Sequence, residues 1–146
     1  MAADLRVGED EGLVGVVVSD TLSRGDERGY GLVITRGKIC GAKKPDALPD
    51  FGVYLGSGSS PPDSVKKDAH SVAGRIVAAK DLEIPVSSIG QALFRKPSLF
   101  FGGYAIIKTS DRAIRLDMSV LYVNPGIAEI SRVMEDSLSA VLGWRL

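Results

Sequence analysis

The sequence predicts a mainly β fold of the α+β class, in which seven strands form a partly open barrel or sandwich capped by a C-terminal helix. Short valine-rich or alternating segments, bounded by turn-forming residues, fill most of the chain. Only two segments space their apolar residues for a helix, at 60–80 and 127–142. We expect a single domain over 1–146, with a flexible start at 1–12 and a loop-plus-helix insertion at 44–80.

The first third of the chain predicts three strands. The valine-rich segment 13–19 ends at a polar loop, 20–29, and is followed by a second strand at 30–35. A tight turn at Arg36-Gly37 leads into a third strand at 38–43, since glycine tolerates the positive φ of such turns.

The insertion begins with a loop rich in Pro, Gly and Ser, which contains a short extended piece at 52–55. Ser60 and the prolines after it are a typical helix start, and we expect this helix to end near Lys80. Its apolar stripe comprises Val65, Ala69, Val72, Ala73, Ile76 and Val77. The stripe packs either on its own barrel or on a neighbouring chain, and Val65, Ala69, Val72 and Ile76 are the candidate interface residues in the second case.

Four further strands and a helix complete the predicted order. The strands are expected at 81–85, 89–96, 104–109 and 113–120. The last of them alternates between apolar and polar residues, which indicates one buried and one solvated face. Asn124-Pro125 predicts the start of the final helix, and Gly143 predicts its end.

Two stretches resemble prokaryotic pleckstrin-homology-like (PH-like) and GRAM-like proteins. The run Gly31 to Lys44 is similar to their second-to-third strand hairpin, L-V-x-T-x-x-R-I-x-G, with Lys38 where Arg is usual and Cys40 where an aliphatic residue is usual. The run Asp81 to Tyr104 is similar to their fourth-to-sixth strand region. The resemblance covers about 13–142 and implies a barrel plugged by its last helix, with no catalytic signature.

The resemblance does not extend to phosphoinositide binding. Eukaryotic PH domains bind these lipids with basic residues in the first hairpin and its loop. Here Arg24 and Arg28 are opposed by Asp20, Asp26 and Glu27, so the charges of this loop nearly cancel.

A candidate anion-binding loop precedes the insertion helix. It comprises Gly56, Ser57, Gly58, Ser59 and Ser60, together with Lys66 and Lys67 on the helix. Backbone amides at a helix start attract anions. A loop with a simple Ser cap is the favoured interpretation, because the prolines here remove amide donors and a P-loop ending is missing.

Leu99, Phe100 and Phe101 form a candidate apolar contact loop between two predicted strands. Such a loop contacts a partner or a membrane surface if it is exposed. We favour the alternative that it folds over the barrel end as core, since large apolar side chains are usually covered.

No residue pattern predicts catalysis. Cys40 is expected to pack in a strand and His70 to lie at the boundary of a helix stripe. The carboxylates Asp46, Asp50, Asp81 and Glu83 have no spacing that singles them out, so an enzyme is the third hypothesis.

The sequence therefore favours a non-catalytic binding or scaffolding module that contacts a protein partner or a second copy of itself, and no nucleic acid. The alternative is a domain that binds an anionic ligand or a lipid headgroup, with peripheral membrane contact not favoured. Export is not expected, because residues 1–11 are polar and acidic and the longest strongly apolar run, 13–18, is far below the roughly 20 residues of a membrane helix. We expect a cytoplasmic location, no metal and no cofactor: the net charge is zero, and Cys40 with His70 cannot complete a zinc site.

Overall fold

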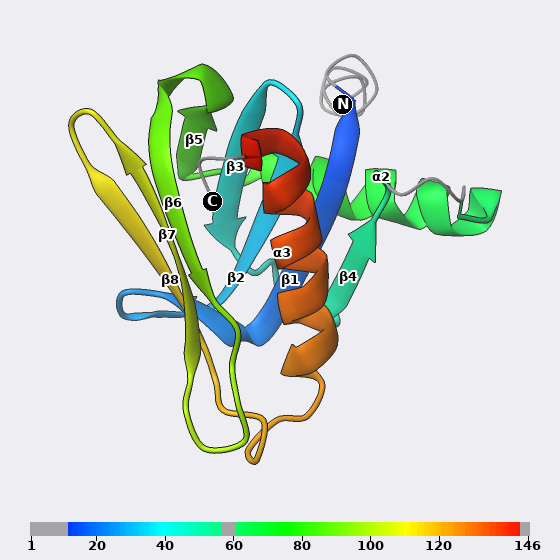
Figure 1. Cartoon of the computed structure of the whole chain (residues 1–146). Helices are drawn as coiled ribbons and strands as arrows, with labels where there is room; N and C mark the ends of the chain where they lie inside the picture. Colours follow the sequence, from blue (N-terminus) through cyan, green and yellow to red (C-terminus); the bar gives the residue numbers. More distant parts are fainter. Residues whose placement is uncertain (1–11, 57–60, 144–146) are drawn as a thin grey trace.

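The computed structural model describes residues 12–56 and 61–143 as an open, mainly β structure with two α-helices (Figure 1). In chain order the elements are β1 (Leu13–Arg24), β2 (Glu27–Thr35), β3 (Lys38–Lys43), β4 (Phe51–Tyr54), α2 (Asp63–Ala78), β5 (Leu82–Pro85), η1 (Val86–Ser88), β6 (Ile89–Arg95), β7 (Gly103–Thr109), β8 (Ala113–Met118) and α3 (Ile127–Leu142). All strand pairs are antiparallel, and the sheet is not closed into a barrel.

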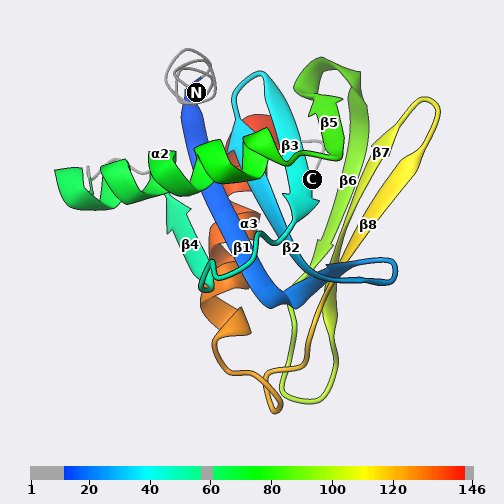
Figure 2. The same cartoon turned by 180° about the vertical axis from the view of Figure 1, so that it is seen from behind.

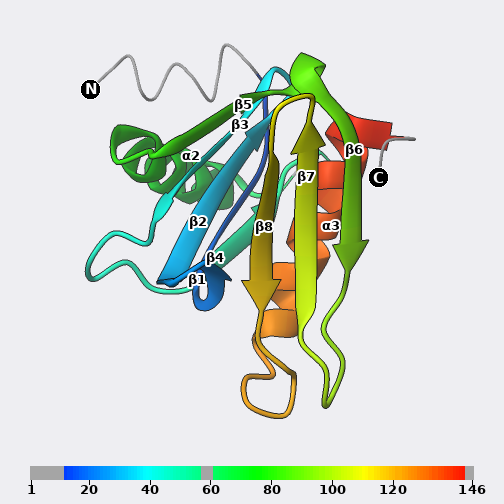
Figure 3. The ribbon, with the colours of Figure 1, turned by 90° about the vertical axis from the view of Figure 1, so that its left-hand side faces the viewer.

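The sheet has the strand order β5-β3-β2-β1-β8-β7-β6, and β4 pairs with β1 outside this path. The long strand β1 joins the two halves of the sheet. Its first part lies between β2 and β4, and its later residues Leu22 and Ser23 pair with β8. Figure 3 shows the two halves diverging, with α3 beside the β6-β7-β8 half and α2 beside β2 and β3.

Two hydrophobic cores lie on the two faces of β1 and β2. The inner core combines both halves of the sheet with α3, and Val17, Leu32 and Leu138 belong to it. The outer core lies under α2 and includes Val16 and Val33 (Figure 2). Because both faces of these strands are covered, their sequence is continuously apolar rather than alternating.

Helix α3 approaches β1 closely at one glycine. A Cβ atom at Gly15 would lie 1.9 Å from Oγ of Ser137 and 2.8 Å from its Cβ. Ser137 is fully buried, and its hydroxyl has no hydrogen-bond partner. The absence of a side chain at position 15 therefore sets how closely the helix packs on the sheet.

A buried tyrosine of β2, Tyr30, connects the end of β1 to the residue before β5. The Tyr30 hydroxyl donates to Oδ1 of Asp81 at 2.5 Å, and the Arg24 guanidinium donates to the Tyr30 oxygen at 3.1 Å. Burial, and then the hydrogen bond to Asp81, raise the pKa of Tyr30 well above its ordinary value.

The order of helices and strands agrees with the prediction, and the extended piece at 52–55 is strand β4. The predicted loop 20–29 is wrong, because β1 and β2 continue through it to a turn at Gly25, whose φ is 59°. Within this stretch Leu22 is fully buried in the inner core and pairs with β8, while Arg24 pairs with Glu27 across the hairpin.

The predicted start of the last helix is also corrected. Helix α3 begins at Ile127 after Gly126, and the Asn124 side-chain oxygen accepts a hydrogen bond from the Gly126 N–H at 3.0 Å. Asn124 therefore closes a turn before the helix rather than capping it. At the other end Gly143 has a φ of 55° and terminates the helix, as predicted.

Candidate functional site: an apolar tip

Two loops lie side by side at one end of the molecule, beyond the ends of the strands (Figures 1 and 3). One connects β6 to β7 and the other connects β8 to α3. Backbone hydrogen bonds join them: Leu121 N–H donates to the Ser98 carbonyl at 2.9 Å, and Tyr122 N–H donates to the Leu99 carbonyl at 3.0 Å. The two loops therefore form one structural unit.

Five large apolar side chains of this unit are exposed, and we call them the apolar tip. Their exposed fractions are 52% for Leu99, 68% for Phe100, 66% for Phe101, 73% for Tyr122 and 73% for Val123. The rings of Phe100 and Tyr122 contact each other with centroids 5.9 Å apart. The favoured prediction that Leu99–Phe101 folds over the sheet as core is wrong, because both loops project away from the cores.

Several backbone groups of the two loops are hydrogen-bonded within the tip. Within the first loop, Ser98 N–H donates to the Phe101 carbonyl at 2.8 Å, and Phe101 N–H donates to the Ser98 hydroxyl at 3.2 Å. In the second loop, Asn124 N–H donates to the Val120 carbonyl at 3.1 Å. Together with the bonds between the loops, these contacts hold the apolar side chains in a fixed arrangement.

The tip and the segments next to it are uncharged. Residues 97–107 and 118–128 contain no Asp, Glu, Lys, Arg or His. The nearest charges in the first loop are the exposed side chains of Arg95 and Lys96, at the end of β6. An apolar tip therefore lies above a short basic pair.

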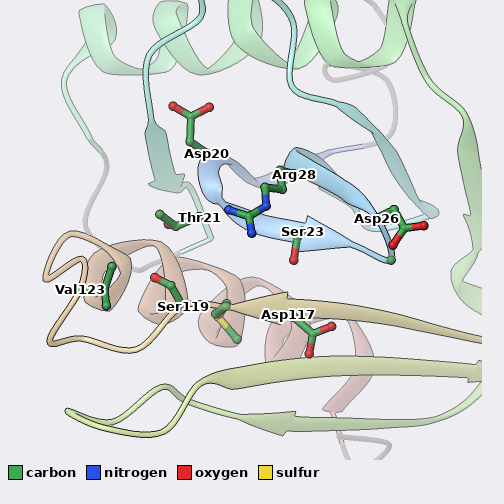
Figure 4. Close-up of a pocket in the computed structure, with 10 residues that line it drawn as sticks. Asp20, Thr21, Ser23, Asp26, Arg28, Asp117, Ser119 and Val123 are labelled. Atoms are coloured by element: carbon green, nitrogen blue, oxygen red, sulfur yellow. The ribbon is translucent and has the colours of Figure 1, made fainter.

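A hollow of about 510 Å³ lies beside the tip, between the β1–β2 hairpin and the end of β8. Val123 and Ser119 line one end, and carboxylates of Asp20, Asp26 and Asp117 line its rim. Figure 4 shows these three carboxylates well separated and directed away from one another. The hollow therefore does not gather its acidic groups around a common point, as a cation site requires.

The structure describes only part of the candidate anion-binding loop. Gly56 is exposed, while Ser57, Gly58, Ser59 and Ser60 lie outside the described residues. Lys66 is half-buried and Lys67 is exposed on the first turns of α2. Anion binding by this loop stays a prediction.

The stripe of the insertion helix packs on the chain's own sheet. Ala69 and Ile76 are fully buried in the outer core and Val72 is 9% exposed, all three against β1, β2 and β3. Only Val65, at the start of the stripe, is left half-buried. The later turns of this helix therefore pack on the chain's own sheet and need no neighbouring chain to cover them.

Several other chemically reactive side chains are engaged in the fold, whereas the buried Nδ1 of His70 has no hydrogen-bond partner. Cys40 is buried in the outer core. The Asp50 carboxylate accepts the Ser19 hydroxyl at 2.8 Å, Asp81 accepts Tyr30, and Glu83 pairs with Lys80. Among the described residues, no three His, Cys, Asp or Glu side chains form a group that could hold a metal ion.

Leu99, Phe100 and Phe101 stood out in the sequence, whereas the other two residues of the tip, Tyr122 and Val123, did not. Tyr122 and Val123 follow a strand whose end is predicted by its alternating pattern. The contact between Tyr122 and Phe100, however, depends on how β7 and β8 pair. The available signal was the long uncharged stretch 118–128. Two uncharged loops at the same end of adjacent strands indicate a joint surface.

Comparisons with protein-family models, with curated proteins and with solved structures give no match to this chain. No helix in the described ranges is long and apolar enough to cross a membrane.

Proposed function

We propose that this chain is a non-catalytic binding module with a PH-like fold, which docks on a lipid bilayer surface through its apolar tip. The observation that carries the proposal is the exposure of five large apolar side chains on two hydrogen-bonded, uncharged loops. A soluble domain rarely leaves such side chains together on its surface unless they contact something.

The PH-like part of the proposal is supported by strand order and by sequence. Without β4, seven strands follow the path β5-β3-β2-β1-β8-β7-β6, and a C-terminal helix packs on the inner side. In chain order, the insertion of β4 and α2 falls between β3 and β5. An experimental structure with a different strand order would overturn this assignment.

A bilayer fits the tip better than a protein partner does. Specific protein interfaces bury about 800 Å² on each partner and involve about 20–30 residues a side, whereas the tip is a small projection. Lipid offers no hydrogen bonds, and these loops bond part of their own backbone internally. Aromatic side chains above a basic pair are typical of the membrane interface.

The size of the effect follows from the exposed fractions. Full burial of a large apolar side chain stabilises by about 1.5–3 kcal/mol, so these partly exposed side chains contribute about 1–2 kcal/mol each. Five of them give about 5–10 kcal/mol, whose lower end is comparable to a single acyl chain and supports reversible binding. On an anionic bilayer Arg95 and Lys96 add about 1 kcal/mol each.

The test is co-sedimentation with vesicles of phosphatidylcholine, alone and mixed with phosphatidylserine, at low and physiological salt. The wild type is expected to sediment with both and more strongly with the anionic mixture. Phe100→Ser with Phe101→Ser removes about 2–4 kcal/mol, so the partition coefficient should fall about 30-fold or more.

Leu93→Ser is the matched control, since Leu93 is an exposed apolar side chain, 38% accessible, on β6 and outside the tip. It should bind vesicles like the wild type. The proposal fails if the wild type stays in solution with both vesicle types at low salt, or if the double variant binds unchanged. Loss of vesicle binding together with association through the tip, seen by light scattering, would identify a protein partner instead.

A further inference from the structure

Strand β4 is a four-residue edge strand that carries no charge and no proline. One side of it pairs with β1 over Phe51–Tyr54, and no strand of the described residues pairs with the other side. Residues 51–56 carry no charge, whereas natural edge strands are commonly protected by Lys, Pro or a bulge. Such an edge is a template for pairing with another strand.

The register with β1 shows which backbone groups are available. Leu55 N–H donates to the Val14 carbonyl at 2.7 Å, so Leu55, Val53 and Phe51 direct their backbone groups toward β1. Gly52 and Tyr54 therefore direct their N–H and C=O groups away from the sheet. No bond from a described residue to these outward groups is present.

These outward groups are arranged for pairing with an identical strand. In an antiparallel pair centred on Val53, Gly52 of one copy lies opposite Tyr54 of the other, and each such pair forms two hydrogen bonds. Val53 then faces Val53 of the second copy in a non-hydrogen-bonded pair.

Helix α2 extends beyond this edge. Figures 1 and 2 show its N-terminal turns projecting past β4, with no strand of its own sheet beneath them. The buried residues of the helix begin only at Ala69, while Val65 is half-buried. Asp63 and Asp68 balance Lys66 and Lys67 on these turns, so a second copy meets no net charge.

We propose that β4 pairs antiparallel with β4 of a second copy, to give a two-fold dimer with a continuous sheet in which the start of each α2 lies over the partner. This surface is separate from the apolar tip, and the proposal does not depend on bilayer docking. It explains together the uncharged edge, the outward backbone groups and the unsupported turns of α2.

A disulfide cross-link tests the register directly. In Val53→Cys the two cysteines face each other in a non-hydrogen-bonded pair, whose Cα atoms lie about 4.5 Å apart, within the range of a disulfide. Mild oxidation should convert most of the protein to a disulfide-linked dimer. Phe51→Cys is the matched control on the same strand and face, and it should not cross-link, because its Cα atoms would be about 13 Å apart.

Light scattering across protein concentrations measures the association itself. The wild type and Val53→Thr should both be dimers. Val53→Lys should be a folded monomer, because two ammonium groups would meet at the two-fold axis. Val65→Glu lies outside the cores and should weaken dimerisation at least 10-fold, even if Val53→Lys fails to fold. A monomeric wild type, equal cross-linking of both cysteine variants, or an unchanged dimer in Val65→Glu overturns the proposal.

Discussion

Replacement of Gly15 by alanine tests the closest contact between α3 and the sheet. The new Cβ would lie 1.9 Å from Oγ of Ser137, a separation that no two heavy atoms tolerate without a bond. Rotation of the unpaired serine hydroxyl can move Oγ, but it cannot move the Ser137 Cβ, which would still lie 2.8 Å from the new Cβ. We therefore expect α3 to shift outward or the inner core to distort.

The magnitude follows from known overpacking effects. An added methyl group in a filled core costs about 1–3 kcal/mol, and this contact lies at the upper end of that range. For a domain of this length each kcal/mol corresponds to about 2–4 °C, so Gly15→Ala should lower Tm by roughly 5–10 °C. Ser137→Ala should instead raise stability by about 1 kcal/mol, since it removes a buried unpaired hydroxyl.

The assay is urea unfolding followed by circular dichroism for the wild type, both single variants and the double variant. In the Ser137→Ala background the cost of Gly15→Ala should shrink by about 1–2 kcal/mol, because the 1.9 Å contact is gone while the 2.8 Å contact to Cβ remains. Additive effects of the two substitutions would refute the reasoning, since they would show that α3 does not touch β1 at this point.

Three further substitutions test the fold and its pH dependence. Gly41→Ala places a Cβ 2.7 Å from the Tyr30 ring and should cost about 1–3 kcal/mol in urea unfolding. Tyr30→Phe should cost about 1 kcal/mol at pH 7. The difference in unfolding free energy between the wild type and Tyr30→Phe should shrink above pH 10.0. There the unfolded wild type releases its phenolic proton, while the raised pKa of Tyr30 keeps that proton on the folded state. The stability of the wild type therefore falls as pH rises. The hydrogen bond from Arg132 is the main cause that lowers the pKa of Glu129 below 4.5. Glu129→Gln should therefore lower the free energy of unfolding by under about 1 kcal/mol near pH 7. It should have no effect at pH values below the folded-state pKa of Glu129.

The order of helices and strands was predictable because the local spacing of apolar residues differs between the two. The alternation at 113–120 and the helical spacing at 127–142 both report which face of an element meets a core. The continuously apolar run 13–18 signals a strand buried on both sides, and α2 supplies the second cover. The extension of β1 to Arg24 was missed because residues 20–29 are mostly polar, although its end pairs locally with β2 as well as with the distant β8.

The apolar tip shows the same division between local and long-range information. Leu99, Phe100 and Phe101 stood out in the sequence, but their exposure depends on where the loop ends relative to α3. A rule that large apolar groups are covered holds for the cores and fails at a surface built for contact. The partnership with Tyr122 follows from strand pairing, which no local pattern encodes.

The two proposed surfaces together predict a behaviour that neither gives alone. A two-fold axis through the β4 pair reverses strand direction, so it places the two tips toward opposite ends of the dimer. Such a dimer cannot bring both tips to one flat bilayer, and dimerisation should not raise vesicle affinity through avidity. It should instead join vesicles, so the wild type should increase the turbidity of phosphatidylcholine–phosphatidylserine vesicles. The monomeric Val53→Lys should bind them without clustering, while Phe100→Ser with Phe101→Ser should remain dimeric and do neither. Clustering by the monomeric variant would show that the tips are not linked through β4.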